Sequence, residues 1–182
     1  MLDANHSRII IMSFDVYADF KQEALTLPRL GIQFSMPAGT EQLKYFGCGP
    51  METYRDKRQA GIVGVYSIDV TNHFEHYIRP QENMAHTETH WVKITDTTGT
   101  GLKISPADST PDISFNCSHF TAEQLTAAKH DYELIPLQET IVHIDYMQAG
   151  IGSNSCGPSI QEKWRLPSGQ YSFAFRFDGI QL

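Results

Sequence analysis

Cysteine is scarce in this sequence. Its 182 residues include three cysteines, Cys48, Cys117 and Cys156, and no two of them have the spacing of a Cys-x-x-Cys metal site. So few and so scattered cysteines exclude the disulfide framework that is typical of small secreted domains. We therefore expect a reducing compartment, the cytoplasm, with the periplasm as the alternative.

Long apolar runs and basic runs are also missing. The longest apolar stretch near the start covers residues 9–12, far short of the ~20 residues that a membrane-spanning helix needs. The 14 Lys and Arg residues are outnumbered by 21 Asp and Glu residues, which gives a formal net charge of −7. A chain without a basic run is poorly suited to displacing counterions from a phosphate backbone. We expect neither a membrane nor a nucleic acid as a partner.

The composition is that of a globular protein. Hydrophobic residues make up 41% of the chain and charged residues 19%. A folded chain of this length buries ~70% of the surface that it exposes when unfolded, so it needs no disulfide or metal to be stable. Since no linker or internal repeat interrupts the sequence, we expect a single domain over residues 1–182.

Apolar and polar residues alternate along several short segments. This period of two predicts half-buried strands over residues 10–18, 32–36, 113–117, 142–146 and 171–177. The last is the clearest, because Tyr171, Phe173, Phe175 and Phe177 share one face of it. Further strands are expected near residues 65–70, inside a long ordered loop over 60–83, and over 91–94. Gly- and Pro-rich turns separate these segments, so the fold class predicted is an all-β antiparallel sandwich.

One helix is predicted. Thr121 and Gln124 have the spacing of a capping box, in which each side chain bonds the other residue's backbone N–H, and Leu125 and Ala128 follow. The helix is expected to run over residues 121–130.

Three polar or glycine-rich patterns invite a functional interpretation. Residues 47–50 read GCGP, but no helix with a Lys-Ser/Thr pair follows as in a phosphate-binding loop, so we predict a tight turn with positive φ at the glycines. Glu52, Tyr54 and Asp56 alternate and would share a face of an extended segment. They are candidates for binding a sugar hydroxyl or an arginine, and a buried polar network between loops is the favoured interpretation.

Histidines form the third pattern. His73 and His76 are followed by His86 and His90, and histidine is the commonest metal ligand. The segment 86–90 lacks the His-Glu-x-x-His order of a zinc helix and runs into a predicted strand. Ordinary surface or pocket histidines are therefore favoured over a metal site.

Three segments together carry a resemblance to a known family. Residues 45–57 read YFGCGPMETYRDK, residues 77–83 read YIRPQEN and residues 147–158 read MQAGIGSNSCGP. In this order they resemble the motifs Y-x-G-x-G-P-x-E-x-Y-x-D-R, Y-x-x-P-x-E-N and G-I/V-G-S-N-S-C-G-P of glycoside hydrolase family 2 β-galactosidases of the large bacterial type. The resemblance covers about residues 30–178, with Lys57 where Arg is usual and Met84 where Gly is usual.

The resemblance implies a galactose-mutarotase-like supersandwich, the C-terminal domain of a β-galactosidase that hydrolyses terminal β-D-galactosides such as lactose. In the family the catalytic glutamates belong to an upstream barrel domain, so no catalytic residue is expected in this chain and the isolated fragment is predicted to be inactive. No cofactor is expected here, because the magnesium and sodium of the family lie on other domains. The implied partners are the β-galactoside substrate, the catalytic barrel and, in the intact enzyme, further copies in a homo-oligomer.

The resemblance also implies where the substrate is met. The loop over residues 150–158 is expected to close the wall of the active site, with Asn154 and Ser155 offering polar contacts. Cys156 matches a position where other members carry Trp, and it either sets the shape of the loop or is merely a small buried residue. Asp145 and Glu162 are candidates for bracing this loop.

Two other classes of function compete. A free carbohydrate-binding or mutarotase-like module would need a general acid and a general base, usually Glu and His, and no motif places such a pair. A purely structural or oligomerisation domain has little need of so particular a turn as residues 150–158.

Overall fold

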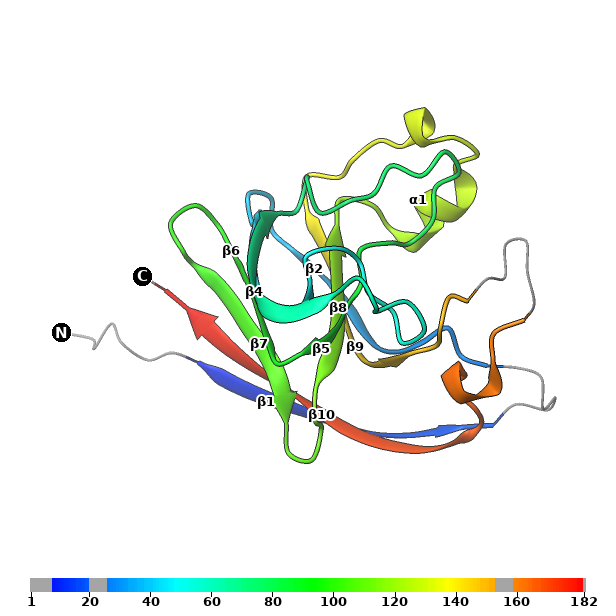
Figure 1. Ribbon diagram of the computed structural model, residues 1–182. Helices are drawn as coiled ribbons and strands as arrows, with labels where there is room; N and C mark the ends of the chain where they lie inside the picture. The colour runs from blue at the N-terminus through cyan, green and yellow to red at the C-terminus, as the bar shows by residue number, and fades with distance from the viewer. Residues whose placement is uncertain (1–7, 20–25, 153–158, 182) are drawn as a thin grey trace.

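The computed structural model describes residues 8–19, 26–152 and 159–181. Its strands form two antiparallel sheets that pack against each other, and the ends of the described chain lie side by side (Figure 1). Strands account for 49% of the described residues and helical turns for 7%. The predicted all-β antiparallel sandwich is confirmed.

The first sheet has six strands. Their spatial order is β1 (Ile9–Ala18), β10 (Gly169–Ile180), β7 (Gly101–Ala107), β6 (Trp91–Thr95), β3 (Gln42–Gly49) and β4 (Ile62–Asp69). The N-terminal strand, whose partner is not evident from the sequence, pairs along its whole length with β10, from Ile9 opposite Asp178 to Ala18 opposite Gly169.

The second sheet has four strands. Their order is β2 (Arg29–Met36), β9 (Thr140–Gln148), β8 (Ile113–Ser118) and β5 (His86–Thr89). The β2–β9 register shifts between Leu30 and Gly31, and the β5–β8 register shifts between His86 and Thr89. Such irregularities re-aim side chains at the end of a strand, and both occur near the cluster of loops described below.

Aromatic and aliphatic side chains of both sheets form the core. Phe173, Phe175 and Phe177 of β10 are buried, as their alternation predicts. The ring of Phe173 stacks on Phe14 of β1 at 5.1 Å between centroids and on Tyr146 of β9 at 4.9 Å. The core therefore joins the two sheets through β10. By contrast, Ile10 and Met12 of β1 are 58% and 41% exposed.

The helix is shorter than predicted. α1 (Ala122–Ala127) begins with the predicted capping box, since Thr121 Oγ1 accepts from the Gln124 N–H and Gln124 Oε1 accepts from the Thr121 N–H. It ends at Ala127, and a separate 3₁₀ turn, η1 (Asp131–Glu133), starts after His130. The helix stops because Ala128 is extended, with ψ of 132°.

The prediction for residues 47–50 is also wrong. Gly47 and Gly49 belong to β3, and positive φ among the described glycines occurs at Gly39, Gly99 and Gly152. Glycine is needed in β3 for close approach, because a Cβ on Gly47 would lie 2.5 Å from Thr89 Oγ1. The turn follows the strand.

Candidate functional site

The three segments that carry the family motifs meet at one end of the sandwich. Glu52 links the first of them to the second: its carboxylate accepts from Tyr77 Oη at 2.8 Å, from the Met84 N–H at 3.0 Å and from Lys57 Nζ. Burial by itself would raise the pKa of Glu52, but the hydrogen bonds from Lys57, Tyr77 and Met84 hold it below its ordinary value. Glu52 is therefore an ionised link between two loops.

Asp56 links the first segment to the third. Its carboxylate accepts from the backbone N–H of Ile151 at 3.1 Å and from that of Gly152. Gly150 permits this approach, since a Cβ there would lie 2.5 Å from Asp56 Oδ2. Gly152 has φ of +55°, which favours glycine. The predicted polar network between loops is present for Glu52 and Asp56, but both residues are half-buried rather than buried, and the two carboxylates bind different loops.

The start of the third segment is held from its other side too. The Gly150 N–H donates to the Trp164 carbonyl at 2.8 Å, and the Ala149 N–H donates to the Pro28 carbonyl at 2.9 Å. Trp164 ends the 3₁₀ turn η2 (Glu162–Trp164). Glu162 thus contributes backbone to the bracing turn, and the contacts described for its side chain include no hydrogen bond to residues 150–152.

Arg29 is the centre of a second polar cluster. Its guanidinium donates to Asp145 through Nε at 3.1 Å and also through Nη2, to Glu82 through Nη1 at 3.0 Å, and to Asn116 through Nη2 at 2.9 Å. Asp145, which is 1% exposed, also accepts from Gln148 Nε2 at 2.7 Å. Asp145 therefore braces β9, the strand that leads into the loop, and its described hydrogen bonds do not reach the loop that it was predicted to brace. Arg29 itself was missed, because no motif marks a lone arginine at the start of a strand.

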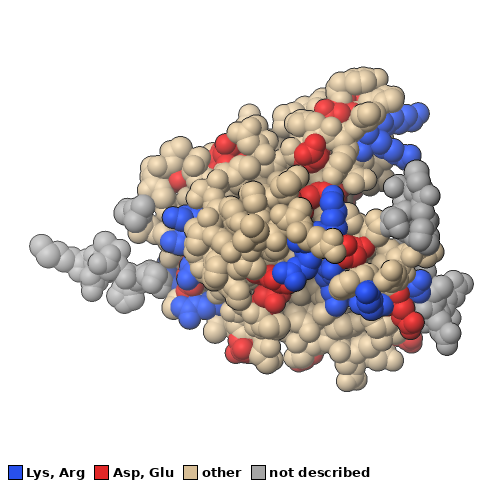
Figure 2. Space-filling view, in the orientation of Figure 1, with Lys and Arg blue, Asp and Glu red and all other residues tan. Residues whose placement is uncertain are grey.

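Two hollows adjoin these clusters. A cavity of about 110 Å³ is lined by Arg29, Glu82, Gln148 and Ile151 among others, and Gln148 Oε1 is the one buried side-chain N or O atom of the described residues without a hydrogen-bond partner. A larger cleft of about 360 Å³ lies between Arg55, Arg58 and Trp164. Over the side of the molecule in Figure 2, basic and acidic side chains lie interleaved and leave no field of one sign.

The predicted substrate-binding residues Asn154, Ser155 and Cys156 lie outside the described residues. The structure describes the residues on either side of them, up to Gly152 and again from Ser159. Asp56 and the backbone of Pro28 and Trp164 fix the first end of this segment.

The histidines have different surroundings from those predicted. His73 and His86 are both buried, at 1% and 0% exposure, with their Nε2 atoms 2.8 Å apart, so the prediction of surface or pocket histidines is wrong for this pair. Their burial follows from β5, which the sequence pattern did not predict and which turns His86 inward. Within the described part of the chain, no three His, Cys, Asp or Glu side chains are grouped so as to hold a metal ion.

Comparison with known proteins decides the family. The family model described as β-galactosidase small chain matches residues 4–177. The chain belongs to this family. A β-galactosidase of Staphylococcus xylosus is 41% identical over 164 residues, which cover 90% of this chain and 16% of the relative. A β-galactosidase of Actinobacillus pleuropneumoniae is 35% identical over 169 residues, covering 93% of this chain and 16% of the relative.

The small-chain family thus accounts for almost the whole sequence. The chain spans about a sixth of the length of these β-galactosidases. The structure adds that the three family motifs form one connected cluster of loops. No helix among residues 8–19, 26–152 and 159–181 has the length and apolarity to span a membrane.

Proposed function

We propose that this small-chain domain forms part of the active-site wall of a β-galactosidase and leaves the cleavage of the glycosidic bond to another part of the enzyme. The observation that carries the proposal is the bracing of Ile151 and Gly152 by Asp56. A loop that only connects two strands gains little from a bracing carboxylate, two backbone anchors and a glycine at positive φ. A loop that must present side chains to a substrate needs that support.

Within this loop, we assign polar contacts with the sugar or with the rim of the barrel to Asn154 and Ser155. Cys156 sets the shape of the loop. A thiol has far less apolar area than an indole and no π face, so stacking on a sugar should be weak at this position compared with family members that carry Trp.

The acidic residues of the loop cluster support the proposal that another part of the enzyme cleaves the glycosidic bond. Retaining glycosidases use two carboxyl groups ~5–5.5 Å apart, one of which must gain and lose a proton. Here Glu52 accepts three hydrogen bonds, Asp56 accepts two from backbone N–H groups, and Asp145 is bonded to Arg29 and Gln148. These hydrogen bonds hold the pKa of Glu52 below its ordinary value, and fixed donors already occupy acceptor positions on all three carboxylates, so they are poorly placed to act as a general acid.

The outer surface is proposed to support assembly of the enzyme. Ile9, Ile10 and Ile11 on the edge strand β1 are 53%, 58% and 53% exposed, and Ile62 on the opposite edge strand β4 is 73% exposed. Exposed apolar edge strands promote pairing with other chains, so they are usually covered in the folded protein. The proposed partners are the catalytic barrel and further copies of the enzyme, with a β-galactoside as substrate and with magnesium and sodium on other domains.

Kinetics of the intact β-galactosidase test the role of the loop. Asn154→Ala should lower kcat/KM about tenfold, which corresponds to about 1.4 kcal/mol for one good hydrogen bond. Replacement of Asn72, which lies at the turn after β4 and bonds Asp69, is the matched control and should leave kcat/KM unchanged. If the Asn154 variant keeps the parent's kinetics while its melting temperature is unchanged, the loop does not reach the active site.

A further inference from the structure

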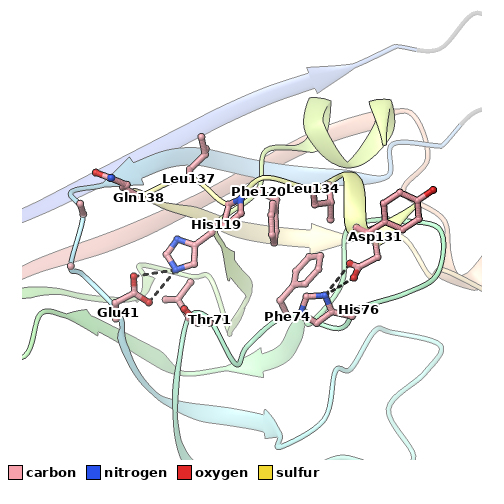
Figure 3. Close-up of a pocket in the computed structure, with 15 residues that line it drawn as sticks. Glu41, Thr71, Phe74, His76, His119, Phe120, Asp131, Leu134, Leu137 and Gln138 are labelled. Carbon is pink, nitrogen blue, oxygen red and sulfur yellow. Dashed lines mark hydrogen bonds and ion pairs between the residues drawn. The ribbon is translucent and has the colours of Figure 1, made fainter. Parts of the chain in front are cut away.

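A third cavity lies apart from the loop cluster. Its volume is about 660 Å³, within the range of ~300–1,000 Å³ typical of small-molecule sites. It is formed by the turn before β3, the segment after β4, and the chain around α1 and η1 (Figure 3). None of the residues that line it contributes to the Glu52, Asp56 or Arg29 clusters.

Aromatic and aliphatic side chains form the middle of this cavity. The rings of Phe74 and Phe120 lie 4.6 Å apart between centroids, tilted by 52°, and Leu134 and Leu137 line the wall beside them. Phe74, Leu134 and Leu137 are half-buried, so part of each faces the open space. This surface can receive an apolar face of a ligand.

A histidine–carboxylate pair lies at one end of the cavity. His119 Nε2 is 3.1 Å from the carboxylate of Glu41, and His119 Nδ1 donates to the Glu139 carbonyl at 2.9 Å. The Glu41 side chain is 29% exposed, against 10% for His119. The imidazole uses one of the lone pairs of Glu41, which leaves the carboxylate able to accept from a ligand.

A second histidine–carboxylate pair lies at the other end, beyond the two phenylalanines (Figure 3). His76 Nδ1 is 2.9 Å from Asp131 Oδ1 and 3.0 Å from Oδ2. The Asp131 side chain is 33% exposed. The cavity thus has an apolar middle and a polar group of the same chemistry at each end.

Backbone hydrogen bonds fix the walls relative to one another. The Val70 N–H donates to the Glu41 carbonyl at 2.9 Å, and the Leu137 N–H donates to the His119 carbonyl at 2.8 Å. The Asp131 N–H donates to the Ile78 carbonyl at 3.3 Å. A ligand that fits this cavity would bind without first ordering the chain, which lowers the entropic cost of binding.

We propose that this cavity binds a neutral saccharide of one or two rings, as a site separate from the loop at residues 150–158. The CH face of a sugar ring lies on Phe74, whose ring packs against the buried Phe120, and its hydroxyl groups donate to Glu41 and Asp131 at the two ends. A purely apolar ligand would desolvate both polar pairs without replacing their hydrogen bonds. An anionic ligand would meet two carboxylates. A ligand with hydroxyl groups around a ring that has an apolar face satisfies both surfaces.

Titration of the isotope-labelled 182-residue chain with galactose and with lactose, followed by amide NMR, tests the site. We expect saturable shifts at residues of the cavity such as Thr71, Phe74 and Gln138. Glu41→Gln and Asp131→Asn should each raise the dissociation constant about tenfold, because each variant loses one hydrogen bond to a charged acceptor. Asp178→Asn removes a carboxylate that is paired with Arg176 outside the cavity and should bind as the parent does.

Several outcomes would overturn the proposal. These are no saturable shift in the cavity at high millimolar sugar, shifts confined to residues near 150–160, or equal affinity in the parent, Glu41→Gln and Asp131→Asn. Cyclohexanol serves as an apolar ring with a single hydroxyl, and binding of it as tight as that of galactose would also contradict a saccharide site. Because the pair of Asp131 is more exposed than that of Glu41, Asp131→Asn keeps the test available if Glu41→Gln fails to fold.

Discussion

His73 and His86 show how a single pair of residues is fitted into the core. The His73 Nδ1–H donates to the Cys117 carbonyl at 3.0 Å, so its Nε2 accepts from His86 Nε2–H at 2.8 Å. His86 Nδ1 lies 3.2 Å from Tyr45 Oη, from which it can accept, and 3.0 Å from the Cys48 carbonyl. Neutral rings satisfy the contacts with Cys117 and Tyr45 and the contact between the two rings. A second proton on His86 could be donated only to the Cys48 carbonyl, and the resulting charge would be buried in the core.

This arrangement predicts a loss of stability at mildly acidic pH. Burial lowers the pKa of His73 to about 4, and burial together with the neighbouring His73 lowers that of His86 to about 3. In the unfolded chain the histidine pKa is near 6.5, so between pH 6.5 and 4 the unfolded chain binds more protons than the folded chain. The stability from the neutral pair is therefore complete above pH 6.5 and is lost as the pH falls toward 4, by up to about 1.4 kcal/mol per pH unit for each ring.

Urea unfolding between pH 5 and 6 measures this slope. His86→Gln removes one titrating ring and should lower the slope by about 1.4 kcal/mol per pH unit, whereas His90→Gln alters a more exposed ring and should not. Imidazole NMR of the parent should show both buried rings neutral at pH 5. Rings that titrate near pH 6.5 in the folded chain would contradict the prediction.

At the scale of elements, the strength of the loop cluster lies in contacts between segments far apart in the chain. Asp56 bonds Ile151 and Gly152 from 95 and 96 residues away, and Arg29 bonds Asp145 from 116 residues away. Asp56 joins two loops, and Arg29 joins the strands β2 and β9. The consequence is a fixed position for Ile151 and Gly152, the described residues that lead into the loop.

Removing one brace should therefore alter catalysis more than folding. In the intact enzyme, Asp56→Ala leaves two backbone N–H groups without their acceptor, and kcat/KM should fall about tenfold because the loop loses its set position. Asp69→Ala removes an exposed carboxylate that accepts from the Asn72 N–H far from the loop, and its kinetics should match the parent. An Asp56→Ala enzyme with unchanged kcat/KM and unchanged melting would show that this brace has no role in the active site.

The sequence predicts the strands and the helix better than it predicts which of their side chains are buried. All five strands identified from alternation are present, and the capping box of α1 is present atom for atom. Alternation also placed Ile10 and Met12 inward with Phe14, yet only the later part of β1 packs into the core. A period of two reports that side chains share a face, but β1 is an edge strand and the smaller opposite sheet does not reach its first residues.

The strands without clear alternation explain the remaining errors. β5 has four residues and a register shift, so neither its length nor its pattern marked it, and the burial of His86 was missed with it. The glycines of β3 were read as a turn because glycine is rare in strand interiors. Gly47 admits Thr89 of the opposite sheet close to the backbone, and Gly49 admits the hydroxyl of Tyr45 from β3 itself. The first of these approaches depends on how the two sheets pack.

For the whole molecule, the family motifs located the loop cluster but not the large cavity. Glu52, Asp56, Asp145 and residues 150–152 lie together because the motifs come from one connected site. Glu41, His76, His119 and Asp131 come from four segments with no shared motif, and only the fold brings them around one space. The two histidine–carboxylate pairs beside Phe74 and Phe120 could therefore not be predicted from the sequence.

The central claim is that this chain shapes a β-galactosidase active site without performing the chemistry. A turnover assay of the pure 182-residue chain with a chromogenic β-galactoside tests it most directly, with circular dichroism to verify the β-sheet fold. The account predicts no hydrolysis above the uncatalysed rate, because the carboxylates of the loop cluster are held by Lys57, Arg29 and backbone N–H groups. Hydrolysis that is abolished by Glu52→Gln or Asp145→Asn would contradict it, since the catalytic carboxylates would then belong to this chain.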